Sequence, residues 1–128
     1  MTAASIIRAT CLATCIAIPA APALAKSCTS ATTTRDMIEC VRTDFDLADG
    51  DLNRAYQEKL AQEDKDGKSL LRKAQRAWIV FRDAECARQA DFARGGTMAP
   101  LLGMTCLTSL TVRRVNELSR NPVTGEIE

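Results

Sequence analysis

Cysteines are the residues of this 128-residue chain whose chemistry is easiest to define. Four of the six cysteines, Cys28, Cys40, Cys86 and Cys106, are separated by 11, 45 and 19 residues, with no C-x-x-C pair and no histidine in the chain. Structural zinc sites use closely spaced cysteines or histidines, so this spacing favours disulfides over a metal site. Four cysteines allow three pairings, and the sequence leaves that choice open.

The acidic residues complete neither a calcium-binding nor a catalytic pattern. The cluster concerned is Asp44, Asp46, Asp49 and Asp51. With Gly50 at the sixth position of an EF-hand loop, the first and third ligand positions fall on Phe45 and Leu47, which cannot bind calcium. A glycosidase-like carboxylate pair, such as Asp83 with Glu85 or Asp46 with Asp49, is expected by chance among 16 acidic residues. Without histidine, Ser-His and Cys-His catalysis is excluded. We predict a protein that is not an enzyme and needs no cofactor, with a carboxylate-based activity as a minor alternative.

Residues 1–25 have the layout of a secretory signal peptide. A single charge, Arg8, precedes an apolar run at 9–18, and small residues at 23–25 form an A-x-A cleavage site. The apolar run is well below the roughly 18 residues that span a bilayer, so we expect no stable membrane insertion. Cleavage near Ala25 would deliver the protein to the periplasm or the medium.

Removal of this leader changes the cysteine count and the charge. Cys11 and Cys15 leave with it, and four cysteines remain in an oxidising compartment. The exported chain has 16 basic and 16 acidic residues, so no basic excess favours nucleic acid. We expect one domain at 26–120 and a frayed tail at 121–128.

Apolar residues recur at helical spacing in three segments, which predicts an all-α fold. The first helix is expected from a cap at Thr34 to about Ala61, with a kink or break at Gly50. A solvated turn at 62–67 follows, and a second helix is expected from about Ser69 to about Phe92.

A third helix is expected after the glycine pair at 95–96, capped by Thr97 and ended by Asn121-Pro122. Three helices joined by short turns pack best as an antiparallel bundle stapled by the disulfides. In such hairpins Cys86 lies level with Cys106, and also with Cys40, so helix register alone does not settle the pairing.

Opposite charges gather on different helices. Residues 36–66 hold ten acidic and four basic residues, whereas residues 67–120 hold ten basic and four acidic ones. The helices could screen each other, or the basic pair could present a face to an acidic partner.

Gln75, Trp78, Arg82 and Glu85 lie on one side of the second predicted helix, because they are three, four and three residues apart. An indole beside a guanidinium can form a semi-buried network with Asp49 or Asn53 of the first helix, or a binding surface. We favour the network, since Trp78 lies within the apolar stripe.

These residues and their neighbours carry a resemblance. The set is Asp49, Leu52, Asn53 and Tyr56, then Gln75, Trp78, Arg82 and Glu85, then Thr111 and Arg114, together with Cys86 and Cys106. The pattern resembles the LprI-type lysozyme inhibitor domain, a family of exported bacterial helical proteins, over residues 28 to 118. Gly50 departs from that pattern.

The resemblance implies a protein partner, host animal-type lysozyme, whose inhibition protects peptidoglycan. The alternative is an envelope interaction or assembly protein that does not bind lysozyme. The recognisable positions are typical of a scaffold, so we expect the binding surface to lie elsewhere on the domain. A rigid loop with a cation and free backbone donors suits a cleft that holds carboxylates, which points to Arg94, Gly95, Gly96 and Thr97. The simpler interpretation of the same residues is a glycine turn.

Overall fold

The computed structural model describes residues 28–120 and 125–127. In chain order the elements are the 3-10 turn η1 (Cys28–Ser30), α1 (Thr34–Gln62), α2 (Lys65–Ala90), the 3-10 turn η2 (Asp91–Ala93) and α3 (Ala99–Leu118). In these ranges the only β pairing is an isolated bridge between Arg120 and Ile127. The predicted signal peptide and residues 121–124 and 128 of the predicted tail lie outside the described residues.

Side-chain caps set the starts of the first two helices. Thr33, not Thr34 as predicted, caps α1, because its Oγ1 accepts the N–H of Asp36 at 3.1 Å. Asp64 caps α2 by accepting the N–H of Gly67 at 2.7 Å, so this helix begins four residues before Ser69. The segment 62–67 has no apolar residue and was predicted as a turn. That prediction was wrong for most of it, since the cap at Asp64 lets polar residues form the first helical turn.

Helix α1 continues through Gly50, and the predicted break does not occur. A Cβ at that position would meet nothing within 4 Å, so the glycine lies on an open surface of the helix. Its intrinsic cost is about 1 kcal/mol relative to alanine. Packing of the neighbouring residues Ala48, Leu52 and Ala55, all buried, offsets that cost.

The third helix begins and ends slightly differently from the prediction. Its N-cap is Met98 without a side-chain cap bond, not Thr97, because the carbonyl of Gly96 already closes a turn with the N–H of Ala99 at 3.3 Å. Pro100 occupies the first turn, where its missing N–H breaks no helical hydrogen bond. The helix ends at Leu118, before the predicted Asn121-Pro122 stop.

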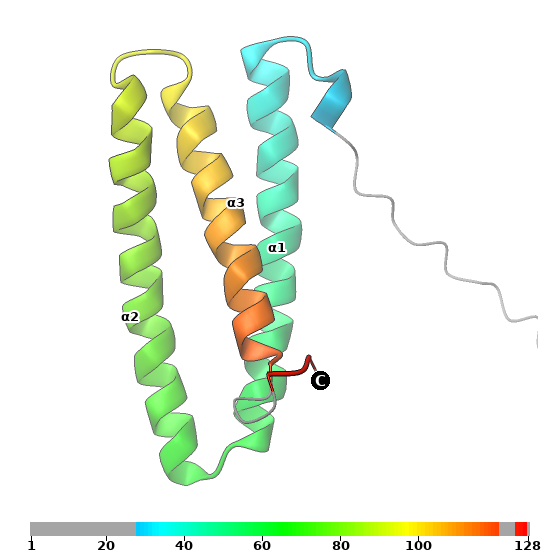
Figure 1. Ribbon diagram of the computed structural model, residues 1–128, viewed down its shortest axis with the longest axis vertical. Coiled ribbons are helices and arrows are strands. Elements are labelled where there is room, and N and C mark those ends of the chain that lie inside the picture. The colour runs from blue at the N-terminus through cyan, green and yellow to red at the C-terminus, as the bar shows by residue number, and fades with distance from the viewer. Residues whose placement is uncertain (1–27, 121–124, 128) are drawn as a thin grey trace, which may run out of the picture.

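Consecutive helices are antiparallel, and α3 packs against both others (Figure 1). Helices α1 and α2 are joined by a two-residue turn. Their backbones come close at few positions, so these two helices meet mainly through long side chains. The all-α, disulfide-stapled bundle predicted from the sequence is confirmed.

Two apolar clusters hold the bundle together. One contains Leu52, Ala55 and Leu118, with Tyr56, Leu71, Trp78 and Val115 packed around it. The other contains Cys86, Cys106 and Leu110, with Trp78 and Leu107. Trp78 touches both clusters, so the indole joins the two halves of the core. Over the described part of the chain, no helix is long and apolar enough to cross a membrane.

Candidate functional site

The predicted binding loop forms the connection between η2 and α3, at one end of the bundle (Figure 1). Gly95 has φ +77°, a backbone conformation that side chains with a Cβ rarely adopt. The N–H of Gly96 donates to the carbonyl of Ala93 at 2.8 Å, and a Cβ on Gly96 would lie 3.2 Å from that oxygen. The backbone conformation of Gly95 therefore favours glycine strongly, and a side chain at Gly96 would crowd the Ala93 carbonyl.

Arg94 projects from the turn, with 79% of its side chain exposed. Its Nε and Nη2 donate to the two carboxylate oxygens of Asp91, at 2.6 and 2.5 Å. Hydrogen bonding to the Asp91 carboxylate raises the pKa of Arg94, so the guanidinium stays charged. A guanidinium has five N–H donors. The three that Asp91 does not use are available to a partner, and the pair fixes their direction.

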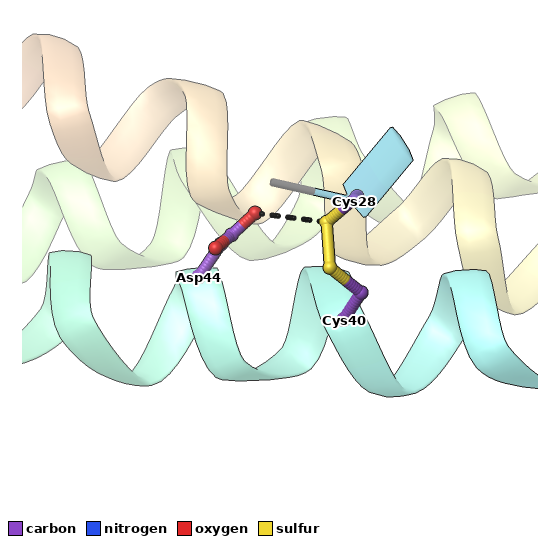
Figure 2. A group of neighbouring side chains, drawn as sticks. All are labelled: Cys28, Cys40 and Asp44. Atoms are coloured by element: carbon purple, nitrogen blue, oxygen red, sulfur yellow. Dashed lines mark hydrogen bonds between the residues drawn. A yellow bond between two sulfur atoms is a disulfide. The ribbon is translucent and has the colours of Figure 1, made fainter. Parts of the chain in front are cut away.

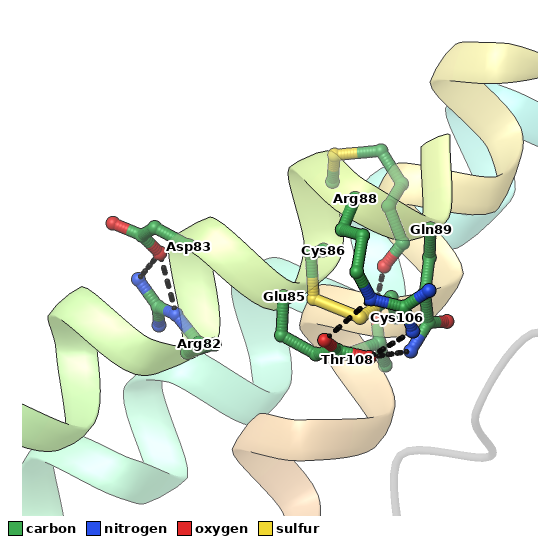
Figure 3. The surroundings of a disulfide bond; sticks show 9 residues. Arg82, Asp83, Glu85, Cys86, Arg88, Gln89, Cys106 and Thr108 are labelled. Atoms are coloured by element: carbon green, nitrogen blue, oxygen red, sulfur yellow. Dashed lines mark hydrogen bonds and ion pairs between the residues drawn. A yellow bond between two sulfur atoms is a disulfide. The ribbon is translucent and has the colours of Figure 1, made fainter. Parts of the chain in front are cut away.

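An exposed aromatic residue lies two positions before Arg94 in the chain. Phe92 of η2 is 80% exposed, and the guanidinium of Arg88 lies 5.7 Å from its ring centre. Arg88 is held in turn by Glu85 at 2.6 Å (Figure 3). The hydrogen bonds from Arg88 and then Gln89 lower the pKa of Glu85 to about 2. Met98, which follows the turn in the chain, is also exposed. We call Phe92, Arg94 and Met98 with the turn between them the tip.

The disulfide between Cys86 and Cys106 fastens the two helices that carry the tip (Figure 3). Both cysteines are buried, and their Cα atoms are 5.4 Å apart. Close helix packing continues toward the turn, since a Cβ on Gly103 would lie 3.4 Å from that of Ala90. The tip is thus anchored on a covalently joined base rather than on two free helix ends.

Five residues of the recognisable motif form a network around Trp78, away from the tip. The guanidinium carbons of Arg82 and Arg114 lie 5.2 and 5.8 Å from the indole ring, and their side chains are only 12% and 16% exposed. Arg114 donates to buried Gln75 at 3.2 Å. Arg82 reaches Asp49 of α1 at 3.9 Å. These contacts join all three helices, as a structural network would.

The remaining motif residues have other surroundings. Asn53 donates to Asp49 at 3.2 Å, and Leu52 and Tyr56 belong to the first apolar cluster. Thr111 is fully buried, and its hydroxyl has no hydrogen-bond partner among the described residues. Glu85 does not join the network, because it pairs with Arg88 and Gln89 on the same helix.

The roles of two aromatic residues were not predicted from the sequence. Phe45 of α1 lies under Arg82, at 5.7 Å from the guanidinium carbon, and extends the network. Phe92 was taken only as the end of the second helix. Apolar spacing marks both rings but does not separate an exposed ring from a buried one, so no sequence signal identified Phe92 as part of the tip.

The second disulfide joins Cys28 of η1 to Cys40 of α1 (Figure 2). Asp44 Oδ2 lies 3.5 Å from Cys28 Sγ, and the three side chains have the spacing of a small metal site. Both sulfurs are consumed by the disulfide, however, and a disulfide sulfur is neither a thiolate ligand nor a proton donor. This corner therefore acts as a staple for the N-terminal arm.

Comparison with known proteins agrees with this picture. The model of the lysozyme inhibitor LprI family matches residues 25–118. The uncharacterised protein R02472 of Rhizobium meliloti is 36% identical over 104 residues, which cover 71% of this chain and 75% of that protein. The uncharacterised protein YecT of Escherichia coli is 38% identical over 58 residues, which cover 37% of this chain and 36% of that protein. No solved structure matches the chain. The chain belongs to the LprI lysozyme inhibitor family.

Proposed function

We propose that this protein is exported to the periplasm or the medium and there binds animal-type lysozyme, which protects peptidoglycan from hydrolysis. The family match and the two disulfides support a binding module of an oxidising compartment. The leader at 1–25 would provide export, with cleavage near Ala25.

The tip is the surface that we assign to the enzyme. Lysozyme cleaves its substrate between two carboxyl groups that lie in a cleft. A charged guanidinium with three unused donors, Arg94, suits such a target, because charge-assisted hydrogen bonds to carboxylates are strong and directional. Phe92 and Met98 offer exposed apolar surface to the same partner. Aromatic rings and arginines are the residue types that most often dominate binding energy at protein interfaces.

Exposure of Arg94 and Phe92 on a disulfide-anchored turn is the single observation that carries this assignment. A pre-ordered loop loses little conformational entropy on binding, so more of its contact energy appears as affinity. The other clustered arginines, Arg82 and Arg114, are committed to Trp78 inside the bundle.

The test is inhibition of cell-wall lysis by an animal lysozyme, with the oxidised, exported chain added in micromolar excess. We expect Arg94→Ala and Phe92→Ala each to raise the inhibition constant about tenfold or more, as hot-spot residues do. Arg54→Ala is the matched control. Arg54 forms a similar exposed pair with Asp51, three residues earlier in the chain and 2.8 Å away, but on α1.

Three results separate the alternatives. Unchanged lysis in the presence of the wild-type chain rejects lysozyme inhibition and leaves the envelope interaction or assembly role. Inhibition that survives both tip substitutions keeps the function and rejects the tip. Equal losses of inhibition in Arg94→Ala and Arg54→Ala would show that the net charge of the protein, and not the tip, governs binding.

A further inference from the structure

A groove of about 470 Å³ opens between the three helices, on the side of the Cys86–Cys106 disulfide. Its walls come from the first half of α1, the second half of α2 and the first half of α3. The tip residues do not line it. The volume falls within the range of about 300 to 1,000 Å³ that is usual for small-molecule sites, which often lie between the helices of a bundle.

Small side chains keep this groove open. Ala87 and Ala90 of α2 face Ala99 and Gly103 of α3, where most helix pairs of a bundle would carry larger apolar residues. The backbones of α1 and α2 scarcely approach each other, and the α1 side chains that line the groove are Ile38 and Arg42. Leu107 and Met104 contribute apolar surface. Binding of an alkyl chain would remove both this apolar surface and the chain itself from water, which is favourable.

The polar groups at the groove are an arginine and an aspartate. Asp83 is neutralised by Arg82, whose Nη2 lies 2.9 Å from its carboxylate. Arg42 is exposed, and its guanidinium has no ion-pair or hydrogen-bond partner in the described part of the chain. An apolar groove with one unpaired cation at its edge is complementary to a molecule that has one alkyl chain and one anionic head group.

We propose that this groove binds a single-chain anionic amphiphile. The alkyl chain lies against Ala87, Ala90 and Leu107, and the head group accepts hydrogen bonds from Arg42. The planar guanidinium matches the geometry of a carboxylate and of a phosphate alike. A fatty acid and a lipid-derived phosphate therefore share the required chemistry. The proposal does not depend on lysozyme binding, because it uses different residues from the tip.

Isothermal titration of the oxidised, exported chain tests it, with dodecanoate, dodecyl phosphate and uncharged dodecyl maltoside, each below its micelle concentration. We expect saturable one-to-one binding of both anions, and weaker binding of the maltoside. Either preference between the two anions supports the site and identifies its head group. Arg42→Gln should weaken the binding of both anions about fivefold, which is the effect of one exposed ion pair. The affinity for the maltoside should not change.

Ala87→Trp should abolish binding of all three ligands, because the indole fills the groove from an exposed position. The matched controls are Arg35→Gln on α1 and Ala84→Trp on α2, which change exposed residues that do not line the groove. Both should bind like the wild-type chain. The circular dichroism spectrum of each variant should match that of the wild-type chain, which checks that its helices are kept.

A second readout locates the ligand. In NMR spectra, dodecanoate should shift the methyl signals of Ile38 and Met104, which line the groove, and spare those of Leu70 and Val80, which are exposed elsewhere on α2. Absence of saturable binding, full binding to Ala87→Trp, unchanged anion affinity in Arg42→Gln, or shifts confined to Leu70 and Val80 would each overturn the proposal.

Discussion

Replacement of both Cys86 and Cys106 by alanine should remove a large share of the stability of this domain. The disulfide closes a loop with a sequence separation of 20. Restriction of the unfolded chain by a loop of that length is worth about 3.3 kcal/mol at 25 °C. Both ends of the loop lie in ordered helices that pack on each other, so the native state gains no comparable freedom when the bond is lost.

The Cys28–Cys40 disulfide gives a contrasting case within the same chain. Its loop has a separation of 12, for which the same relation gives about 2.8 kcal/mol. One of its ends, however, lies in the short arm before α1 rather than in a packed helix. Without the bond, this arm would detach in the folded state as well as in the unfolded state. We therefore expect Cys28→Ala/Cys40→Ala to cost less than about 1 kcal/mol, as most substitutions outside a core do.

Urea unfolding followed by circular dichroism measures both differences under identical conditions. A loss of about 3.3 kcal/mol should lower the midpoint of thermal unfolding by roughly 13 to 26 °C, since each kcal/mol shifts a domain of this size by about 4 to 8 °C. Equal losses from the two double variants would refute the distinction between a packed staple and an arm staple. A loss below about 1 kcal/mol from Cys86→Ala/Cys106→Ala would refute the loop-closure argument itself.

Two further predictions concern single side chains. Thr111→Val should stabilise the domain by about 1 kcal/mol in urea unfolding, because valine keeps the shape and removes a buried hydroxyl that has no partner; a loss of stability would show that the hydroxyl is bonded. Arg88, and then Gln89, lower the pKa of Glu85 from 4.5 to about 2, so its stabilising effect should be complete above pH 4.5 and decline as the pH falls toward 2. The difference in unfolding free energy between the wild-type chain and Glu85→Gln should therefore shrink from pH 5 to pH 2.5, and a constant difference would contradict this assignment.

Helix number and packing were predictable because apolar spacing records which face of each helix is buried. The same spacing says little about helix ends, which depend on individual hydrogen bonds. Asp64 begins α2 within a fully polar segment, and only its bond from the N–H of Gly67 reveals this. The effect of Gly50 on the first helix was overestimated. The low helix propensity of glycine costs about 1 kcal/mol, and burial of the adjacent helix face outweighs that cost.

The sites were less predictable than the fold. Residue types and spacing located the Trp78 network, since three members of it lie on one helix face. The exposure of Phe92 and the groove near Arg42 depend on the distance between helices, which no local pattern encodes. The sequence therefore identified the scaffold better than the surfaces that the scaffold presents.

Charge on the helices bears on both surfaces. Among the described residues, the ion pair between Arg82 and Asp49 is the one that joins two different helices, at 3.9 Å, and every other pair lies within three residues along the chain. The opposite charges of α1 and the later helices are thus little consumed by contacts between helices. Packing around Trp78 and the Cys86–Cys106 bond hold the bundle instead, and cations such as Arg42 remain at the surface with their charge available to a partner.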